Sequence, residues 1–304
     1  MKNVLPDHVQ EWVLHTVNSQ GKIVAIQQLL GGMSSVMHKI SIQSGEVLTD
    51  VVIRQVDNEE WLEEEPDLAL HEAKSLEWAI DVDVPTPNLI AYDQSGAICG
   101  VPTVLMTKLE GVVELQPKNM EEWVDGLANA LAKVHQLNAD HFPYTYFTYQ
   151  NLSTLEVPSW SSYKEQWRQV IDIVKGPCPK TRECFIHRDY HAANVLWTGN
   201  KVSGIVDWVN ACKGPAGIDV GHCRVDMAQL HGVEYSDAFL TAYQKHAGEL
   251  FLYDPYWDLI ALIDILFGPP EVYPGWPALG VKGLTNEIIA HRLDEYMLSL
   301  LKRI

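Results

Sequence analysis

Apolar residues recur along the chain with two different periods, and the change of period divides the chain into two halves. In the first half they follow the alternation typical of strands, with turn residues between the runs. The predicted strands cover residues 22–30, 36–43, 47–56, 88–92 and 101–108. Helical spacing interrupts this pattern at residues 6–18 and again at residues 68–80. The first half is therefore predicted to be β-rich and to carry one inserted helix.

Past Gly111 the spacing of apolar residues becomes helical. The predicted helices cover residues 120–137, 160–174, 218–231, 235–248, 255–267 and 283–302. A strand-like island at residues 184–208 interrupts them, and within it apolar runs at residues 195–197 and 202–206 flank a turn. The pattern predicts an α+β fold with two domains, a β-rich one at residues 1–108 and a mostly helical one at residues 109–304.

The charge balance restricts the classes of partner. The chain of 304 residues has 22 Lys and Arg against 40 Asp and Glu, a formal net charge of −18. We find no run rich in Lys and Arg, so nucleic acid and anionic membrane surfaces are disfavoured as partners. The same negative field would attract a cationic small molecule.

Cysteine usage and the N-terminal sequence favour a cytoplasmic location. The five cysteines are scattered and form no Cys-x-x-Cys pair, which disfavours a disulfide framework and a zinc knuckle. The first eight residues lack the apolar core of a signal peptide. The apolar run at residues 259–267 is interrupted by Asp264 and is too short to cross a bilayer. We expect a cytoplasmic protein.

The segment with the most chemical information lies in the strand-like island. It has the form His-x-Asp-x-x-x-x-Asn, with His187, Asp189 and Asn194, and Asp207 follows thirteen residues after the Asn. Phosphoryl transfer needs this set of groups. A carboxylate can orient an attacking hydroxyl and take its proton, while a carboxamide and a second carboxylate can supply oxygen ligands to Mg²⁺.

With Trp208 directly after Asp207, this segment resembles the catalytic loop and metal-binding Asp of the aminoglycoside phosphotransferase and choline kinase family. The resemblance covers nearly the whole chain and implies a two-lobed, protein-kinase-like fold. It also implies an enzyme that transfers the γ-phosphate of ATP or GTP, bound with Mg²⁺ between the lobes, to a hydroxyl of a small molecule. Asp189 would be catalytic, and Asn194 and Asp207 would hold the metal.

The same resemblance identifies a candidate nucleotide loop between the first two predicted strands. Backbone N–H groups exposed by Gly31 and Gly32 can approach phosphate oxygens closely, and the hydroxyls of Ser34 and Ser35 can add donors. By itself a pair of glycines before Met-Ser-Ser is most often an ordinary turn. Its place in the order of family motifs is what favours phosphate binding.

Arg54 stands where the family commonly has a Lys that pairs with the nucleotide phosphates. The resemblance makes Glu72, on the inserted helix, its carboxylate partner. Arginine is also a cation and offers a planar fork of donors, although its reach differs from that of lysine. We expect an active site despite this departure, because Asp189, Asn194 and Asp207 are all intact.

The strand at 101–108 and the residues after it resemble the last strand and the hinge of the first lobe. Backbone groups of Thr107 and Leu109 would hold the adenine, and Met106 would line the pocket behind it. An edge strand that runs into a loop would have the same residues, so only the order of motifs favours nucleotide binding.

Two further roles and one rival chemistry concern residues near the motif. Asp219 is expected to cap the following helix and to brace the catalytic loop, and His187 to stabilise the loop rather than transfer protons. A zinc hydrolase is the rival, since His187 and His191 would share a face of a helix, with His222 or Asp189 as a third ligand. The glycine, strand and Asn signals around them do not favour a helix there.

The sequence leaves the chemical class of the acceptor open. Aromatic residues of the C-terminal half could form a cavity for a hydroxylated amine together with acids drawn from Asp226, Asp254, Asp258 and Asp264. An aminoglycoside or an amino alcohol fits the acidic chain, but family members also phosphorylate sugars, homoserine-like metabolites and macrolides. Antibiotic resistance, the choice of ATP or GTP, and the oligomeric state are not decided by the sequence.

A protein substrate is disfavoured because only residues 208–218 separate Asp207 from Asp219, which leaves no long activation segment. The alternative from another functional class is a non-catalytic nucleotide-binding protein of the same fold. The Arg54 substitution supports it, and the intact set of Asp189, Asn194 and Asp207 counts against it.

Overall fold

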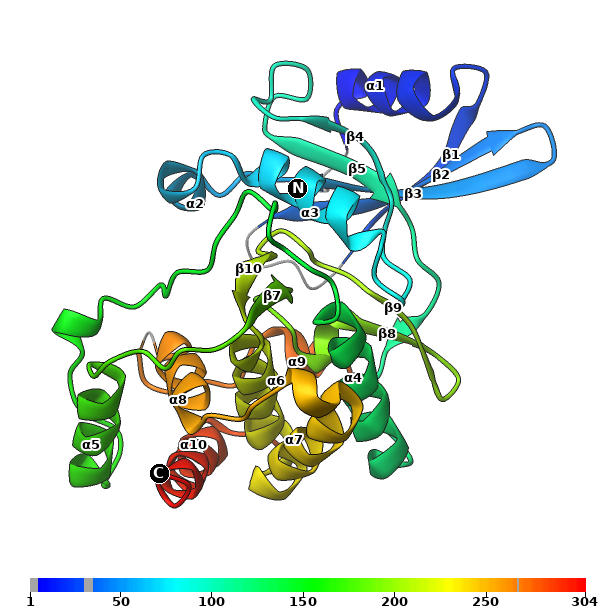
Figure 1. Cartoon of the computed structure of the whole chain (residues 1–304). Helices are drawn as coiled ribbons and strands as arrows, with labels where there is room; N and C mark the ends of the chain where they lie inside the picture. The colour runs from blue at the N-terminus through cyan, green and yellow to red at the C-terminus, as the bar shows by residue number, and fades with distance from the viewer. Residues whose placement is uncertain (1–4, 30–34, 267) are drawn as a thin grey trace. The chain divides into compact units, whose positions relative to one another are not determined.

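The computed structural model describes residues 5–29, 35–266 and 268–304 of the chain. The chain forms two compact units (Figure 1). Unit 1 comprises Met1–Asp81, Pro85–Glu110 and Ile205–Asn210, and unit 2 comprises Val82–Val84, Gly111–Gly204 and Ala211–Ile304. The short segment at residues 205–210 thus belongs to unit 1 although its neighbours in sequence belong to unit 2. The division into domains at residues 108 and 109 stays a prediction.

Unit 1 is built on a five-stranded sheet in the order β1-β2-β3-β5-β4. Its strands are β1 (Lys22–Gln28), β2 (Val36–Ser44), β3 (Val47–Gln55), β4 (Leu89–Asp93) and β5 (Thr103–Thr107). Neighbouring strands in this sheet are antiparallel, which confirms the meander predicted for the first three. The tight turn between β2 and β3 uses Gly45 with a φ of 60°, a conformation that favours glycine.

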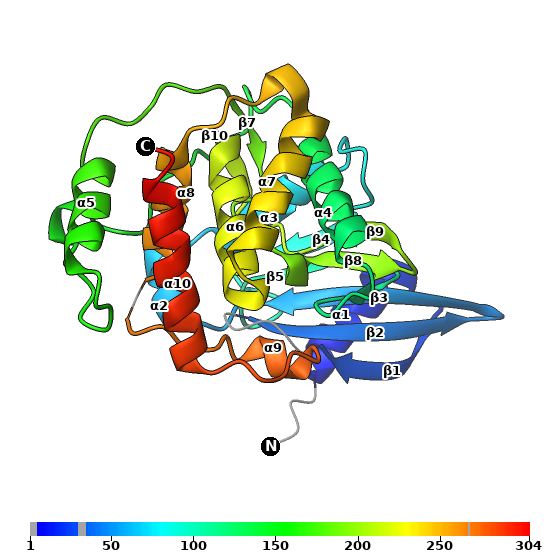
Figure 2. The same cartoon turned by 90° about the horizontal axis from the view of Figure 1, so that it is seen from below.

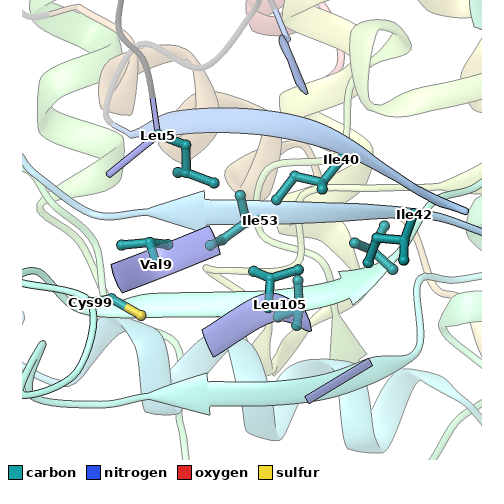
Figure 3. Packing of buried hydrophobic residues seen from close by; sticks show 9 residues of the cluster. Leu5, Val9, Ile40, Ile42, Ile53, Cys99 and Leu105 are labelled. Atoms are coloured by element: carbon teal, nitrogen blue, oxygen red, sulfur yellow. The ribbon is translucent and has the colours of Figure 1, made fainter. Parts of the chain in front are cut away.

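Helix α1 (Asp7–Asn18) covers one face of this sheet and completes the core of unit 1. Val9 on α1 packs with Ile40, Ile53 and Leu105 of the strands and with Cys99 (Figure 3). These side chains are almost completely buried. Burial of each large aliphatic side chain contributes about 1.5–3 kcal/mol, so the alternation along β2 and β3 determines which face the helix covers.

Two helices lie between β3 and β4. The predicted helix is present as α3 (Leu68–Ala79), and α2 (Glu59–Glu64) is an additional helix that the sequence pattern missed. Six residues are too few for a helical period, so α2 depends on its cap and on tertiary contacts. The side chain of Asn58 accepts a hydrogen bond from the N–H of Trp61, and Trp61 packs on a cluster that contains Val209 from the segment 205–210.

Unit 2 is mostly helical. Its helices are α4 (Met120–Val134), α5 (Lys164–Val174), α6 (Ala216–His231), α7 (Val233–Ala247), α8 (Pro255–Asp264), α9 (Gly275–Ala278) and α10 (Asn286–Leu301). Helix α6 packs against α7, α8 and α10, and α4 packs against α7 (Figure 2). Because α6 is covered on several sides, most of its residues are buried. It forms the centre of the unit.

Short strands complete unit 2. An antiparallel pair joins β7 (Glu183–Ile186) to β10 (Cys212–Pro215), and a three-stranded sheet has the order β6-β8-β9. The members of this sheet are β6 (Val112–Val113), β8 (Val195–Thr198) and β9 (Lys201–Ile205). The predicted strand-like island corresponds to β8 and β9, whereas β6 and β10 were missed because they are short. Single 3-10 turns, η1 to η3, lie at Leu152–Thr154, Ala192–Asn194 and Gly248–Leu250.

No helix in the described part of the chain is long and apolar enough to cross a membrane.

Candidate active site

The predicted catalytic loop directly follows β7 in unit 2. The strand ends at Ile186, and the chain then turns sharply through Arg188, whose φ of 67° lies in the left-handed region. This conformation is uncommon for a residue other than glycine and costs about 1–3 kcal/mol, so surrounding contacts must hold it. The turn directs Asp189 away from the buried strand, and a third of its side-chain surface stays exposed, with a relative value of 32%.

Asp219 on α6 holds this turn from behind. Its carboxylate oxygens accept hydrogen bonds from the backbone N–H groups of His187, at 2.7 Å, and of Arg188, at 2.6 Å. The predicted brace is therefore confirmed. The predicted role as a cap is wrong, because α6 begins at Ala216 and Asp219 lies within its first turn.

The carboxylate of Asp219 is completely buried and has compensating partners. Burial raises its pKa, but the contacts with His135 and His187 outweigh burial, so the pKa lies below its ordinary value. His135 Nε2 lies 2.9 Å from Asp219 Oδ2, and its Nδ1 lies 2.6 Å from the hydroxyl of Tyr243. Since the carboxylate can only accept, Nε2 carries the proton and Nδ1 accepts from Tyr243. A buried chain of hydrogen bonds thus fixes the backbone beside Asp189.

Asn194, at the end of η2, faces Asp189 through its carboxamide nitrogen. That nitrogen donates to the carbonyl oxygen of Asp189 at 2.9 Å and to its Oδ2 at 3.2 Å. His191 Nε2 lies 3.1 Å from the same nitrogen. The carboxamide oxygen is therefore directed to the opposite side, where a hard oxygen ligand would be available to a cation.

Two histidines that the motif did not mark as catalytic lie beside Asp189. His222 Nε2, on α6, is 3.3 Å from Asp189 Oδ1, and His191 Nε2 is 3.7 Å from the same oxygen. Burial lowers the pKa of His222, and this outweighs the attraction of Asp189. His222 is 33 positions from Asp189 in sequence, so only its helical phase relative to Asp219, three residues earlier, could have indicated that it faces the same loop.

Asp226, one turn after His222 on α6, adds a buried carboxyl group behind this loop. The pKa of Asp226 is raised to about 6, mainly by burial and also by the neighbouring charge of Asp189, whereas His191 opposes the shift. Its carboxylate also accepts the backbone N–H of Ala192.

An aromatic clasp defined by Arg188, Phe147 and Tyr149 holds the other side of the loop. The guanidinium carbon lies 4.1 Å from the centre of the Phe147 ring and 4.0 Å from that of Tyr149. The Nη2 of Arg188 also donates to the carbonyl of Phe147 at 2.7 Å. The hydroxyls of Tyr146 and Thr148 donate to Asp264 at the end of α8, so the same segment is tied to a second carboxylate.

In unit 1, Arg54 on β3 lies between two carboxylates. Its Nε is 3.5 Å from Glu72 Oε1 and its Nη2 is 2.8 Å from Asp207 Oδ1. The pair of Arg54 and Glu72 expected from the sequence is therefore present, and the contact with Asp207 is an addition. The side chains of Arg54 and Glu72 are almost completely buried, while Asp207 keeps 25% of its side-chain surface exposed.

The two carboxylates around Arg54 influence each other. The pKa of Glu72 is raised to about 7: burial is the main cause, Asp207 acts in the same direction, and Arg54 opposes the shift. Asp207 follows the end of β9 and has a φ of 68°, so it shares with Arg188 the left-handed backbone that is uncommon outside glycine.

The remaining predicted nucleotide-binding residues belong to unit 1. Gly31, Gly32 and Ser34 lie outside the described residues, and Ser35, directly before β2, is buried. Met106 is buried on β5, and Leu109 is half-buried. The backbone N–H of Thr107 donates to the carbonyl of Asn88 at 2.9 Å, so a base would have to use other atoms of Thr107. These roles stay predictions.

Comparison with models of protein families shows to which family the chain belongs. The model of the APH family, described as the phosphotransferase enzyme family, matches residues 26–262. The chain belongs to this family. The matched range includes β2, the loop of Asp189, the segment with Asp207 and α6, so the family predicted from the motifs is confirmed.

Curated relatives of this APH chain are homoserine kinases. The homoserine kinase of Rhodopseudomonas palustris strain BisA53 is 29% identical over 188 residues, which are 54% of this chain and 54% of that protein. The homoserine kinase of Methylorubrum populi is 30% identical over 133 residues, which are 38% of this chain and 39% of that protein. The chain thus spans about half the length, or less, of the curated relatives it matches.

Solved structures confirm the predicted protein-kinase-like fold of this APH chain. Aminoglycoside phosphotransferase APH(4)-Ia matches with a TM-score of 0.61 at 13% identity and covers 97% of this chain and 98% of that chain. Macrolide 2'-phosphotransferase MphH from Brachybacterium faecium matches with a TM-score of 0.59 at 14% identity, over 85% of this chain and 89% of that chain. At these identities the likeness shows the fold alone.

A thermostable mutant of APH(4)-Ia in a ternary complex with AMP-PNP and hygromycin B also matches. Its TM-score is 0.61 at 12% identity, over 98% of each chain.

Each of the four acids proposed for the acceptor has a partner within this APH chain. Asp254 caps α8 and accepts the N–H of Tyr256, and the buried carboxylate of Asp258 pairs with Arg224. Asp226 and Asp264 belong to the surroundings of the catalytic loop. The described residues contain no cluster of three His, Cys, Asp or Glu side chains that could hold a metal ion. His187 is fully buried and packs edge-on against Tyr190, as a structural role requires.

Proposed function

We propose that the protein is a small-molecule kinase that transfers the γ-phosphoryl group of a nucleoside triphosphate to a hydroxyl group of a small acceptor. The observation that carries this proposal is the loop after β7, whose backbone is held by Asp219 and in which Asp189 is partly exposed and contacted by Asn194. Membership of the phosphotransferase enzyme family supports it. In this proposal residues 1–108 bind the nucleotide and residues 109–304 carry the catalytic loop and the acceptor site.

The proposed chemical step uses Asp189 as the base. Its carboxylate accepts a hydrogen bond from the acceptor hydroxyl and orients the oxygen toward the γ-phosphorus. A bond forms between that oxygen and phosphorus while the bond to the bridging oxygen of the nucleotide breaks, and the hydroxyl proton passes to Asp189. The nucleoside diphosphate leaves with the electron pair of the broken bond.

The remaining charged residues are proposed to hold the phosphates and magnesium. Asn194 and Asp207 would supply oxygen ligands, and both fit because the Asn194 oxygen faces away from Asp189 and the Asp207 carboxylate is partly exposed. When bound, magnesium neutralises charge on the transferred phosphates. Arg54, oriented by Glu72, would pair with the phosphates, with Gly31, Gly32, Ser34 and Ser35 as further donors and Met106, Thr107 and Leu109 at the base.

We favour ATP with Mg²⁺ as co-substrate, with GTP as the alternative. The likeness to a structure that holds AMP-PNP supports an adenine nucleotide. Because nucleoside triphosphates and free thiols are characteristic of the cytoplasm, and the five cysteines are all free, the proposal includes a cytoplasmic location.

The acceptor proposed is a small hydroxylated amine. Homoserine kinases among the relatives support an amino-acid-like acceptor, and the likeness to a complex with hygromycin B supports an aminoglycoside. Both classes carry an ammonium group, which the net charge of −18 would attract. If the acceptor is an aminoglycoside, the activity would confer antibiotic resistance.

The test is Mg²⁺-dependent nucleotide consumption by purified protein with a panel of homoserine, choline, aminoglycosides, macrolides and sugars. Wild type and Asp189→Asn are compared, because the amide keeps the size of the side chain but cannot take a proton. We expect turnover with an amine of the panel and a loss of at least about a hundredfold in kcat for Asp189→Asn. Asp172→Asn, an exposed site on α5, is the matched control and should be fully active.

A second candidate function is non-catalytic nucleotide binding. The ion pair between Arg54 and Asp207 favours it, because the guanidinium competes with a metal ion for the same carboxylate oxygen. Isothermal titration with ATP and with GTP distinguishes the two. Binding without turnover on the entire panel, and equal binding by Asp189→Asn, would support the second candidate.

A further inference from the structure

We propose that His222 and His191 are positioning residues, His222 for the carboxylate of Asp189 and His191 for the carboxamide of Asn194. This inference rests on the proposed function. It concerns residues that lie outside the His-x-Asp-x-x-x-x-Asn pattern or at its variable positions.

His222 contacts Asp189 from a different element than Asn194 does. Its Nε2 is 3.3 Å from Oδ1, and the Asn194 nitrogen is 3.2 Å from Oδ2. The Asn194 nitrogen donates to Oδ2 from η2, and the His222 ring contacts Oδ1 from α6, so both oxygens are restrained against rotation about the χ2 bond. Each oxygen still has a second lone pair, so Asp189 keeps the capacity to accept the acceptor hydroxyl.

The surroundings of His222 favour a neutral ring whose Nε2 faces Asp189. Its ring stands 5.8 Å from that of His191, and the charges of Asp219 and Asp264 act on the pKa of His222 more weakly than that of Asp189. Burial lowers the pKa of His222, which is the direction that keeps it uncharged in the working range of most enzymes. A neutral donor orients Asp189 without removing its charge, as an enzymatic base requires.

His191 acts on Asn194 by accepting. Its Nε2 is 3.1 Å from the Asn194 nitrogen. Because an amide nitrogen only donates, Nε2 is the acceptor in this contact. The carboxamide nitrogen therefore meets three acceptors, counting the carbonyl and Oδ2 of Asp189. A flipped carboxamide would place its oxygen against all three, so His191 helps determine that the oxygen, and not the nitrogen, faces a cation.

A metal site is the other use that two histidines beside a carboxylate could have. Within the described residues no group of three His, Cys, Asp or Glu side chains is arranged to hold a metal ion. The contacts of His222 with Asp189 and of His191 with Asn194 support a positioning role instead.

The test for His222 compares His222→Gln with His222→Leu. Glutamine can place an amide N–H near the position of Nε2, and leucine keeps a similar bulk without a donor. We expect His222→Leu to lower kcat by about tenfold to a hundredfold with KM for the nucleotide within about twofold of wild type, and His222→Gln to recover most of kcat. His291→Leu, at an exposed histidine on α10, is the control and should change neither constant.

The test for His191 compares His191→Gln with His191→Leu and adds a readout that needs no turnover. The midpoint of the Mg²⁺-dependent rise in melting temperature is measured with AMP-PNP present. We expect His191→Leu to shift this midpoint to about tenfold higher Mg²⁺, and His191→Gln, whose amide oxygen can accept, to stay near wild type.

The outcomes separate the inference from the proposed function. A wild type that is inactive on the entire panel contradicts the proposed function. The Mg²⁺ midpoint of His191→Leu then still decides the inference about His191. An active wild type with unchanged kcat in His222→Leu, or an unchanged midpoint in His191→Leu, overturns the inference. Glutamine variants no better than the leucine variants, with an equal loss of melting temperature in both, also overturn it, because that result indicates packing alone.

Discussion

At the residue scale, two residues beside Asp189 are held in states that cost free energy. Arg188 has a left-handed backbone and a buried guanidinium between two rings. Asp226 is a buried carboxyl group close to another acid. Each costs free energy that the rest of unit 2 must offset, and the costs fall within a few residues of the proposed base.

The aromatic clasp should contribute strongly to the stability of unit 2. Arg188→Ala removes a charged hydrogen bond of about 1.5–3 kcal/mol and cation–π contacts of about 0.5–2 kcal/mol, whereas alanine keeps the cost of the left-handed backbone. We expect the free energy of unfolding, measured with urea, to fall by about 2–4 kcal/mol. Arg168→Ala, at an exposed arginine of α5, should lower the free energy of unfolding by less than about 0.5 kcal/mol. Equal effects of both substitutions would contradict a stabilising clasp.

The pH dependence of stability should show the buried carboxyl group of Asp226. Its pKa is raised from 3.8 to about 6 in the folded protein, so its contribution to stability is complete below pH 3.8 and is lost as the pH rises to about 6. Asp226→Asn cannot ionise. We expect it to be more stable than wild type at pH 7.5 by up to about 3 kcal/mol, at about 1.4 kcal/mol per pKa unit, and to lose this advantage near pH 4.

Urea unfolding of both proteins between pH 4 and pH 7.5 measures this difference. Asp172→Asn, at an exposed carboxylate, is the control and should follow wild type at every pH. A constant difference between Asp226→Asn and wild type over this range would show that ionisation is not its origin.

The residues of the site that the sequence predicted are those that local spacing places together. Asp189 and Asn194 lie on one short loop, whereas the pair of Arg54 and Glu72 was predicted from the family resemblance. The sequence indicated His222 only as a candidate zinc ligand, because its contact with Asp189 depends on how α6 packs behind β7. The ion pair of Arg54 with Asp207 joins segments 153 residues apart, and no periodicity indicates it.

At the element scale, α6 is the helix on which the proposed catalytic loop depends. It carries Asp219, His222 and Asp226 on the side of the loop, and it packs against α8 through glycines on another side. A Cβ added at Gly217 would meet Trp257 of α8 at 2.7 Å. The close approach of the two helices therefore requires glycine at this position.

Gly217→Ala should separate α6 from α8. Overpacking of this kind costs about 1–3 kcal/mol, and because α6 also holds the backbone of His187 and Arg188, we expect a loss of kcat as well as of stability. Gly268→Ala is the control, since a Cβ there meets nothing within 4 Å. Differential scanning calorimetry and nucleotide turnover are the measurements. A stable Gly217→Ala protein with full kcat would show that the loop does not depend on this packing.

Elements were predicted well where a period could be recognised and poorly where it could not. The long helices α4, α6, α7 and α10 and the sheet of unit 1 follow from periodicity. Helix ends differ by a few residues, as at α8, which ends at Asp264 rather than at 267, because caps and packing decide them. The short elements α2, β6 and β10 are stabilised by partners distant in sequence.

At the scale of the whole molecule, the negative charge distinguishes between acceptors. Net charge of −18 increases encounters with cations and does not act on neutral sugars. Between about 0.01 M and 0.15 M salt the screening length falls from about 30 Å to about 8 Å. For an amine acceptor we expect kcat/KM to fall several-fold over this range, mainly through KM, with kcat nearly unchanged.

Initial rates at both ionic strengths, with an aminoglycoside or amino acid and with a neutral sugar, provide the comparison. A neutral acceptor that is turned over should show no such salt dependence. If the rates with the amine and with the sugar change in parallel, the net charge has no part in the selection of the acceptor.

Because residues 205–210 belong to unit 1, this unit can be completed only late in the synthesis of the chain. Val209 completes a cluster with Val56 and Leu68, and the N–H of Ile205 donates to the carbonyl of Pro85, so unit 1 lacks part of its core until this segment has left the ribosome. By then most of unit 2 has also been synthesised. For the same reason, no single crossover point can exchange unit 1 with that of a relative, because a chimera joined near residue 110 would receive Asp207 from the other parent.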